Sequence, residues 1–191
     1  MEGIDGCGKS SVAKLLVKRI GSRAVFTREP TDSWIGKAVR KGDKHELSPY
    51  TDALLFMADR AQHTLEISKL LGKGKLVVSD RYYHSTIAYQ AACLKGVFDG
   101  DPFKWLLEAN LKISLQPDLT IILDVPPELG LERIKGRNKL SRFERAAFLK
   151  QVRANYLKLA RLDRSIVKID ARGDLESVTD RVLELVKQRN L

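Results

Sequence analysis

The feature that most constrains this chain is a glycine-rich segment close to its first residue. It reads Gly3-Ile4-Asp5-Gly6-Cys7-Gly8-Lys9-Ser10 and fits the pattern G-x-x-x-x-G-K-[ST]. The glycines of such a loop let backbone N–H groups curl around a phosphate, and the positive end of the following helix adds attraction. Lys9 would contact oxygens of the transferred phosphate, and Ser10 would ligate Mg²⁺. A chance glycine-rich turn is the alternative, but the amphipathic helix that follows at once favours a phosphate-binding loop.

Strands and helices are predicted to alternate along the rest of the chain. Short, continuous apolar runs, which are typical of parallel strands covered on both faces, predict strands at 24–27, 75–79, 119–123 and 165–169. Helical spacing of apolar residues predicts helices over 9–20, 48–71, 85–94, 102–113, 127–135, 142–162 and 175–189. This alternation predicts an α/β fold of the three-layer α/β/α P-loop type, with a parallel sheet and a single domain over 1–191.

One expected strand has no counterpart in this sequence. A P-loop normally follows a buried strand, and only Met1 and Glu2 precede the loop. Losing five or six buried apolar side chains at about 1.5–3 kcal/mol each would remove on the order of 10 kcal/mol. A whole domain has a net stability of only about 5–15 kcal/mol. We therefore expect either that the natural chain begins upstream with an apolar strand, which is the preferred expectation, or that the sheet has an open central slot.

Composition restricts the class of protein. No apolar run approaches the roughly 20 residues of a membrane span, so we expect no membrane partner. With Cys7 and Cys93 as the only cysteines, we expect no disulfide framework and a cytoplasmic location. The formal net charge is +10, which would suit nucleic-acid binding or an enzyme for nucleotide polyphosphates. Because the basic residues are spread along the chain without a dense run, we expect no nucleic-acid partner.

A second motif follows the strand predicted at 75–79. Ser79-Asp80-Arg81-Tyr82 lies at the carboxyl end of that strand, and ligands of parallel sheets bind at this edge. An aspartate there can hold Mg²⁺ through water, and an adjacent arginine can bind a second phosphate with its guanidinium. The alternative is a surface salt bridge, which contributes little. The position after an apolar strand favours the functional interpretation.

Two further patterns remain open from spacing alone. Phe56 and Arg60 share one face of a helix and could stack on a base and hydrogen-bond its edge, although a core phenylalanine beside a surface arginine is the preferred interpretation. The basic segment from Gly136 to Arg142 could close over a polyphosphate and place an arginine on the transition state. It could equally be a solvated turn.

Taken together, the motifs resemble the thymidylate kinase family, whose members transfer phosphate from ATP to thymidine monophosphate. The resemblance follows family order over nearly the whole chain. Its segments are Glu2 to Ser11, Thr27-Arg28-Glu29-Pro30, Leu54 to Arg60, Asp80 to Gln90, and Pro117 to Thr120 with Leu123-Asp124-Val125.

The resemblance implies a set of site residues. Those that would bind the ATP donor are Gly3, Ile4, Asp5, Gly6, Cys7, Gly8, Lys9, Ser10, Ser11 and Arg133. Those that would bind the thymidylate acceptor are Asp5, Arg28, Glu29, Phe56, Arg60, Arg81, Thr86, Tyr89 and Gln90. The implied catalytic residues are Lys9, Arg81, Asp5, Arg137 and Arg142, and the implied Mg²⁺ residues are Ser10 and Asp80.

It also implies individual roles. Phe56 would stack on thymine while Arg60 hydrogen-bonds its carbonyl edge, which reverses the preference drawn from spacing. Asp5 would contact the sugar hydroxyl of the acceptor, and Arg81 its phosphate. Tyr89 would pack beneath the sugar and disfavour a 2′-hydroxyl. Thr86 and Gln90 would lie near the base, Arg28 and Glu29 near the transferring phosphate, and Arg133 would pack on adenine.

Family members differ in where the catalytic arginine lies. Some carry it in the phosphate loop, at the position that Gly6 holds here. In this chain we expect it in a small lid at about 136–143, with Arg137 and Arg142 as candidates and Lys139 third. The resemblance thus implies an ATP- and Mg²⁺-dependent thymidylate kinase, as a homodimer. Another nucleoside monophosphate kinase of the same fold, or a non-catalytic P-loop nucleotide-binding protein, is the alternative.

Overall fold

The computed structural model describes residues 1–42, 45–135 and 145–191. Its strands are β1 (Ala24–Arg28), β2 (Leu76–Asp80), β3 (Thr120–Asp124) and β4 (Ile166–Asp170). Its helices are α1 (Lys9–Ile20), α2 (Trp34–Gly42), α3 (Pro49–Leu71), α4 (Tyr83–Leu94), α5 (Pro102–Ile113), α6 (Pro127–Ile134), α7 (Ala146–Leu162) and α8 (Leu175–Gln188). The four predicted strands are confirmed, each ending one residue later than predicted.

Two helices differ from the prediction. The sequence interpretation missed α2, although Ser33 carries the signal: its hydroxyl accepts from the N–H of Gly36 at 3.1 Å, as an N-cap side chain does. Helix α4 begins at Tyr83 rather than at the predicted residue 85. The predicted start of α7 at residue 142 lies outside the described residues.

The sheet consists of two parallel pairs joined by the first two residues. β1 pairs with β2 and β3 with β4, each in parallel register. Glu2 donates its N–H to the carbonyl of Ile121 at 2.8 Å and accepts from the N–H of Leu123 at 2.9 Å. On the other side, the terminal ammonium of Met1 donates to the carbonyl of Ser79 at 2.7 Å. Met1 and Glu2 therefore bridge β2 and β3 at the carboxyl edge of the sheet.

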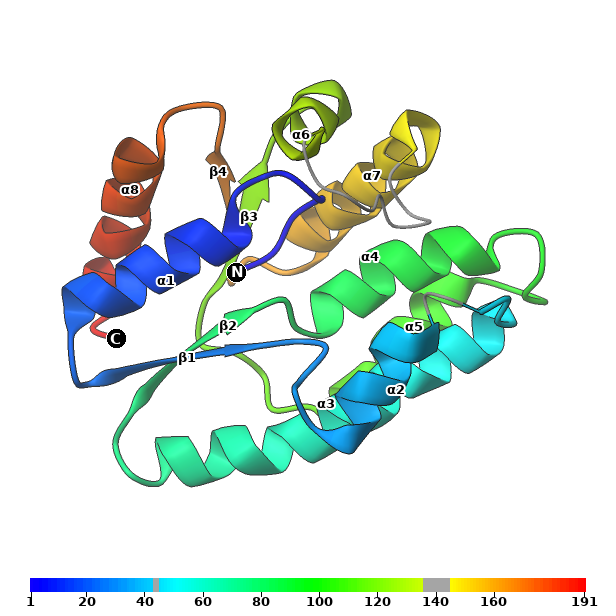
Figure 1. The fold of residues 1–191 in the computed structure, drawn as a ribbon, viewed down its shortest axis with the longest axis horizontal. Helices are drawn as coiled ribbons and strands as arrows, with labels where there is room; N and C mark the ends of the chain where they lie inside the picture. The colour runs from blue at the N-terminus through cyan, green and yellow to red at the C-terminus, as the bar shows by residue number, and fades with distance from the viewer. Residues whose placement is uncertain (43–44, 136–144) are drawn as a thin grey trace.

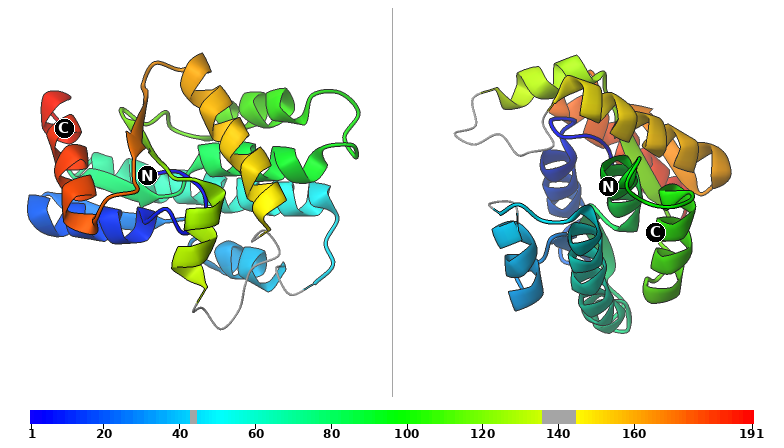
Figure 2. Two further views of the ribbon diagram at one scale, coloured as in Figure 1. Left: turned by 90° about the horizontal axis from the view of Figure 1, so that it is seen from above. Right: turned by 90° about the vertical axis from the view of Figure 1, so that its right-hand side faces the viewer.

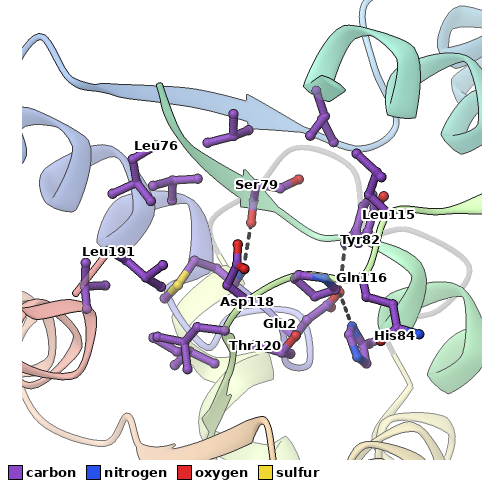
Figure 3. Close-up of a pocket in the computed structure, with 18 of the residues that line it drawn as sticks. Glu2, Leu76, Ser79, Tyr82, His84, Leu115, Gln116, Asp118, Thr120 and Leu191 are labelled. Carbon is purple, nitrogen blue, oxygen red and sulfur yellow. Dashed lines mark hydrogen bonds and ion pairs between the residues drawn. The ribbon is translucent and has the colours of Figure 1, made fainter. Parts of the chain in front are cut away.

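An apolar cavity occupies the centre of the sheet beyond this bridge. Its volume is about 140 Å³, and its walls come from β2, β3, the segment before β3 and the C-terminal residue (Figure 3). Leu76, Val78, Ile121 and Leu191 are among the apolar side chains that line it. In this chain, Met1 and Glu2 thus fill only the carboxyl end of the position between β2 and β3, and the preferred expectation of an upstream strand stays a prediction.

Helices cover both faces of the sheet (Figures 1 and 2). α1 packs on β1 and β2, and beside it α8 packs on β4, while α3, α4 and α7 cover the opposite face. All four strands run in parallel, so their carboxyl ends meet at the edge where the glycine-rich loop lies (Figure 1). The predicted α/β class with a parallel sheet is confirmed. Within the described part of the chain, every helix is too short or too polar to cross a membrane.

Candidate active site

The glycine-rich loop connects Glu2 to α1, and its shape depends on Gly6. Gly6 has a φ of 80°, in the left-handed region that favours glycine. A Cβ at this position would lie 1.9 Å from the carbonyl oxygen of Gly130, on α6. The loop and α6 are therefore in direct backbone contact. No side chain, and so no arginine, fits at this position without moving α6.

The ammonium group of Lys9 lies inside the loop. Its Nζ donates to the carbonyls of Gly3 at 2.9 Å and Ile4 at 2.8 Å, and lies 3.7 Å from the Sγ of Cys7. The side chain is buried. Lys9 thus holds a positive charge among the backbone groups of a loop that would surround a phosphate.

Ser10 and Asp80 form the part of the site that fits a magnesium ion. The Ser10 hydroxyl donates to Oδ2 of Asp80, while Oδ1 of Asp80 is buried and has no hydrogen-bond partner among the residues that the structure describes. Leaving a buried carboxylate oxygen unsatisfied costs free energy, and a cation at this point would remove that cost. A hydroxyl and a carboxylate are hard oxygen ligands of the kind Mg²⁺ prefers, so the residues present fit the ion.

Three of the predicted acceptor residues, Asp5, Arg81 and Tyr89, lie together around the Arg81 guanidinium. This guanidinium forms an ion pair with Asp5, donates to the Ser85 hydroxyl at 3.3 Å and lies 5.1 Å from the centroid of the Tyr89 ring. The Tyr89 hydroxyl donates to the other oxygen of Asp5 at 3.0 Å.

Charge and burial set the protonation states of this group. Burial is the largest single influence and would lower the pKa of Arg81, but Asp5, Tyr89, Tyr156 and Asp80 together outweigh it and hold that pKa well above its ordinary value. Burial, and then the charge of Asp5, raise the pKa of Tyr89 well above the ordinary value of a phenol. The group therefore keeps a charged guanidinium and a neutral phenol over the physiological pH range.

A second buried network surrounds Arg60 on α3. The Arg60 guanidinium donates to the Thr86 hydroxyl at 2.9 Å and to Oδ1 of Asn110 at 2.8 Å, and forms an ion pair with Glu29. Its Nε is buried and has no hydrogen-bond partner within the described part of the chain. His63 contacts the other oxygen of Glu29 at 2.9 Å. Arg60 is 1% exposed, so the sequence-only interpretation of a surface arginine is wrong.

The remaining predicted acceptor residues differ in how deeply they are buried and in whether they join the buried networks. Gln90 is buried on α4 and donates to Asp52 at 3.2 Å. Phe56 is half-buried on the same helix as Arg60. Arg28 forms an exposed ion pair with Asp32 at 3.0 Å, so its guanidinium does not join the buried networks.

A larger cavity runs along the phosphate loop. Its volume is about 560 Å³, and it extends from Arg81 past the loop to Arg133 and the segment 171–175. Arg133 donates to the carbonyls of Ala171 and Arg172, each at 3.0 Å, so its position on α6 is fixed. The shape and lining of this cavity suit a nucleotide with its phosphates against the loop. The predicted lid residues Arg137, Lys139 and Arg142 lie outside the described residues.

Sequence reasoning missed four buried polar residues of this region. His63 lies one helical turn beyond Arg60, and that spacing could have identified it. Asn110 and Asp52 contact the acceptor residues only through tertiary packing. Glu2, buried at the base of the loop, accepts hydrogen bonds from the start of α4.

Comparisons with known proteins agree with the geometry. A family model described as thymidylate kinase matches residues 1–182. A probable thymidylate kinase of Thermococcus gammatolerans is 39% identical over 206 residues, covering 100% of this chain and 96% of the relative. One of Archaeoglobus fulgidus is 41% identical over 191 residues, covering 98% and 93%. The structure of thymidylate kinase from Candida albicans matches with a TM-score of 0.80 at 26% identity, covering 99% of this chain and 90% of that one.

Proposed function

This chain belongs to the thymidylate kinase family, and from that premise we propose how its residues carry out the reaction. The protein is a phosphotransferase that moves the terminal phosphoryl group of ATP to thymidine monophosphate and yields thymidine diphosphate and ADP. The observation that carries the residue assignment is the position of Arg81. It lies next to Asp80 of the proposed magnesium site and forms an ion pair with Asp5 of the phosphate loop.

The acceptor end of the reaction is assigned to the two buried networks. Arg81 binds the phosphate of thymidine monophosphate, and Asp5 contacts its sugar hydroxyl. Tyr89 packs beneath the sugar, where a 2′-hydroxyl would be disfavoured. Arg60 hydrogen-bonds the thymine edge, supported by its unpartnered buried Nε, and Phe56 stacks on the ring.

Transfer is assigned to the donor end. The acceptor phosphate is already ionised, so one of its oxygens attacks the γ-phosphorus without a general base, the bond to the bridging oxygen breaks and ADP leaves. Lys9 and a lid arginine neutralise charge on the transferred group. Ser10 and Asp80 would hold Mg²⁺, which would supply positive charge at the phosphate oxygens.

The lid carries the catalytic arginine in this proposal. The contact between Gly6 and Gly130 leaves no room for an arginine in the loop. Arg137 and Arg142 are the candidates, in a single domain over 1–191 whose lid spans about 136–143. Replacing each by alanine and comparing single-turnover rates identifies the acting residue. Equal rates for both variants and the unmodified enzyme would exclude a lid arginine.

A homodimer in the cytoplasm is also part of the proposal. One face of α3 carries an exposed apolar stripe, Leu54, Ala58, Ala61 and Leu65, at helical spacing. Leu54 and Leu65 are 54% and 56% exposed, and an antiparallel copy of the same helix would cover them. The low cysteine count supports a reducing compartment.

A coupled assay of ADP release tests the function. The thymidine, uridine, cytidine and adenosine monophosphates are compared at equal concentration, and the thymidine nucleotide is expected to react fastest. Equal rates on all four would favour a general nucleoside monophosphate kinase. Steeply salt-dependent DNA binding without diphosphate product would favour a non-catalytic nucleic-acid-binding protein.

A further inference from the structure

The structure contains a buried carboxylate that the reaction as described does not use. Glu2 is 1% exposed, and its carboxylate accepts four hydrogen bonds. Oε1 accepts from the N–H of Tyr82 at 2.7 Å and of Ser85 at 3.3 Å. Oε2 accepts from the hydroxyls of Ser85 at 2.5 Å and Tyr156 at 3.0 Å.

Two of these contacts cap α4 from outside the helix. The first N–H groups of a helix lack intrahelical partners and favour a negative charge. The residue before α4, Tyr82, makes no side-chain cap. Glu2 takes the place of a cap by accepting from the N–H of Tyr82 and from that of Ser85, the third residue of the helix, whose N–H is shared with the carbonyl of Tyr82 at 3.0 Å. A carboxylate at the base of the phosphate loop thereby fixes the start of the helix that carries Thr86, Tyr89 and Gln90.

A third contact orients the Ser85 hydroxyl. A hydroxyl has one proton to donate, and Ser85 donates it to Glu2. The lone pairs of the same oxygen are therefore left to accept, and the Arg81 guanidinium donates to it at 3.3 Å. With the carboxylate removed, the Ser85 proton could turn toward Arg81 and the contact would become repulsive.

The backbone of Arg81 is held by the same two N-terminal residues. Arg81 has a φ of 71°, which is unfavourable for a residue with a side chain. Its N–H donates to the carbonyl of Met1 at 2.9 Å, and Glu2 accepts from the next N–H along, that of Tyr82. Hydrogen bonds thus hold both peptide units that flank Arg81, and they fix the backbone conformation that directs its guanidinium toward Asp5.

We propose that Glu2 is a positioning residue of the acceptor-phosphate site, which caps α4 and orients Ser85 so that Arg81 is held ready for the phosphate. This inference rests on the proposed role of Arg81. It predicts an effect on the acceptor rather than on ATP, because neither Glu2 nor Ser85 is among the described residues that line the donor cavity, and Arg81 lies only at its end.

The test compares Glu2→Gln with Ser85→Ala and with both changes together, in steady-state assays of the full chain. Glutamine keeps the size of the side chain, but its amide group meets donors at one of its two positions. We expect KM for thymidine monophosphate to rise about tenfold in each single variant, the effect of one hydrogen bond to a charged group, while KM for ATP stays unchanged. Because both act through one contact, the double variant should be no worse than the worse single variant.

Controls separate this inference from the function itself. Asn155→Ala removes a different hydrogen bond to α4, from the Asn155 amide to the carbonyl of Ala88 at 2.8 Å, and it should leave KM for thymidine monophosphate unchanged. Additive effects in the double variant, an equal rise in Asn155→Ala, or a parallel rise in KM for ATP would overturn the inference. If Glu2→Gln does not fold, the Ser85→Ala variant decides by itself, and an unchanged KM for thymidine monophosphate in that variant would overturn the inference. No turnover of thymidine monophosphate by the unmodified enzyme would instead refute the proposed function, and an unaltered KM in Arg81→Ala would refute the proposed role of Arg81.

Discussion

Arg81 and Asp5 lie 76 residues apart in the chain and form an ion pair at the carboxyl edge of the sheet. Arg81 adopts a left-handed backbone to reach it, a conformation that costs a residue with a side chain about 1–2 kcal/mol. Such strain persists where the surroundings hold it and is frequent at functional sites. Here the pair links the phosphate loop to the segment between β2 and α4, so the proposed donor and acceptor sites share one ion pair.

Replacing Arg81 by alanine removes the proposed clamp on the acceptor phosphate. We expect kcat/KM for thymidine monophosphate to fall about 10²–10³-fold, the range seen when one group that stabilises transition-state charge is removed, while ATP binding is largely kept. Steady-state ADP release measures the first quantity and calorimetry the second. Arg189→Ala, an exposed arginine at the far end of α8, is the matched control. Unchanged turnover in Arg81→Ala would remove Arg81 from the site.

Gly6 and Gly21 form a natural pair for testing the loop. Their φ values are 80° and 82°, but a Cβ at Gly21 meets nothing within 4 Å, whereas one at Gly6 lies 1.9 Å from Gly130. Because Gly21 has a ψ of −150°, a region almost restricted to glycine, Gly21→Ala should cost about 1–3 kcal/mol of unfolding free energy from its backbone alone. Gly6→Ala should cost clearly more in urea unfolding and should also weaken ATP binding. Equal losses in the two variants would contradict a close loop–α6 contact.

Asp80→Asn tests the magnesium site through the unpartnered Oδ1. An amide lacks the charge that holds water on the metal, so the Mg²⁺ concentration for half-maximal activity should rise about 10–100-fold. Activity titrated against free Mg²⁺ at saturating ATP gives this number, and chelation of the metal should abolish turnover. Asp99→Asn, in an exposed loop, should behave as the unmodified protein does. If Asp80→Asn needs the same Mg²⁺ concentration for half-maximal activity as the unmodified protein, Asp80 does not hold the metal.

The α3 stripe predicts self-association. Leu65→Glu puts a charge into the proposed interface, where burying it unpaired is costly, and should convert a dimer into a monomer of 21.5 kDa. Sedimentation equilibrium distinguishes the two. Leu162→Glu on α7 changes a leucine of similar exposure, 62%, outside the stripe and should leave the dimer intact. A dimer that survives Leu65→Glu would place the interface elsewhere.

The sequence predicted those elements that local patterns determine. Continuous apolar runs located all four strands, and α1 was predicted to the residue. Two local signals were missed, the Ser33 cap before α2 and the Arg60–His63 spacing. The contacts of Glu2 with Ser85 and of Arg60 with Asn110 join residues 83 and 50 positions apart. No local pattern encodes such contacts, because they exist only after α4 and α5 pack against the sheet and α3.

His84 makes the stability of the fold depend on pH. The side chain is 2% exposed, and its ring stacks on Tyr83 at 4.0 Å. Among the described residues its Nδ1 has no hydrogen-bond partner, and it lies 3.9 Å from Oε1 of Glu2. Burial lowers its pKa from 6.5 to about 4, against the opposing charge of Glu2. The contribution of His84 is therefore fully present above pH 6.5 and decreases toward pH 4, because only the unfolded chain binds the proton in that window. The loss by pH 4 is about 3 kcal/mol at roughly 1.4 kcal/mol per pKa unit.

Urea unfolding at about pH 4.5 and 7.5 measures this change. The free energy of unfolding should depend less on pH in His84→Gln than in His45→Gln, whose histidine is exposed. Identical slopes in the two variants would mean that His84 is protonated in the folded protein.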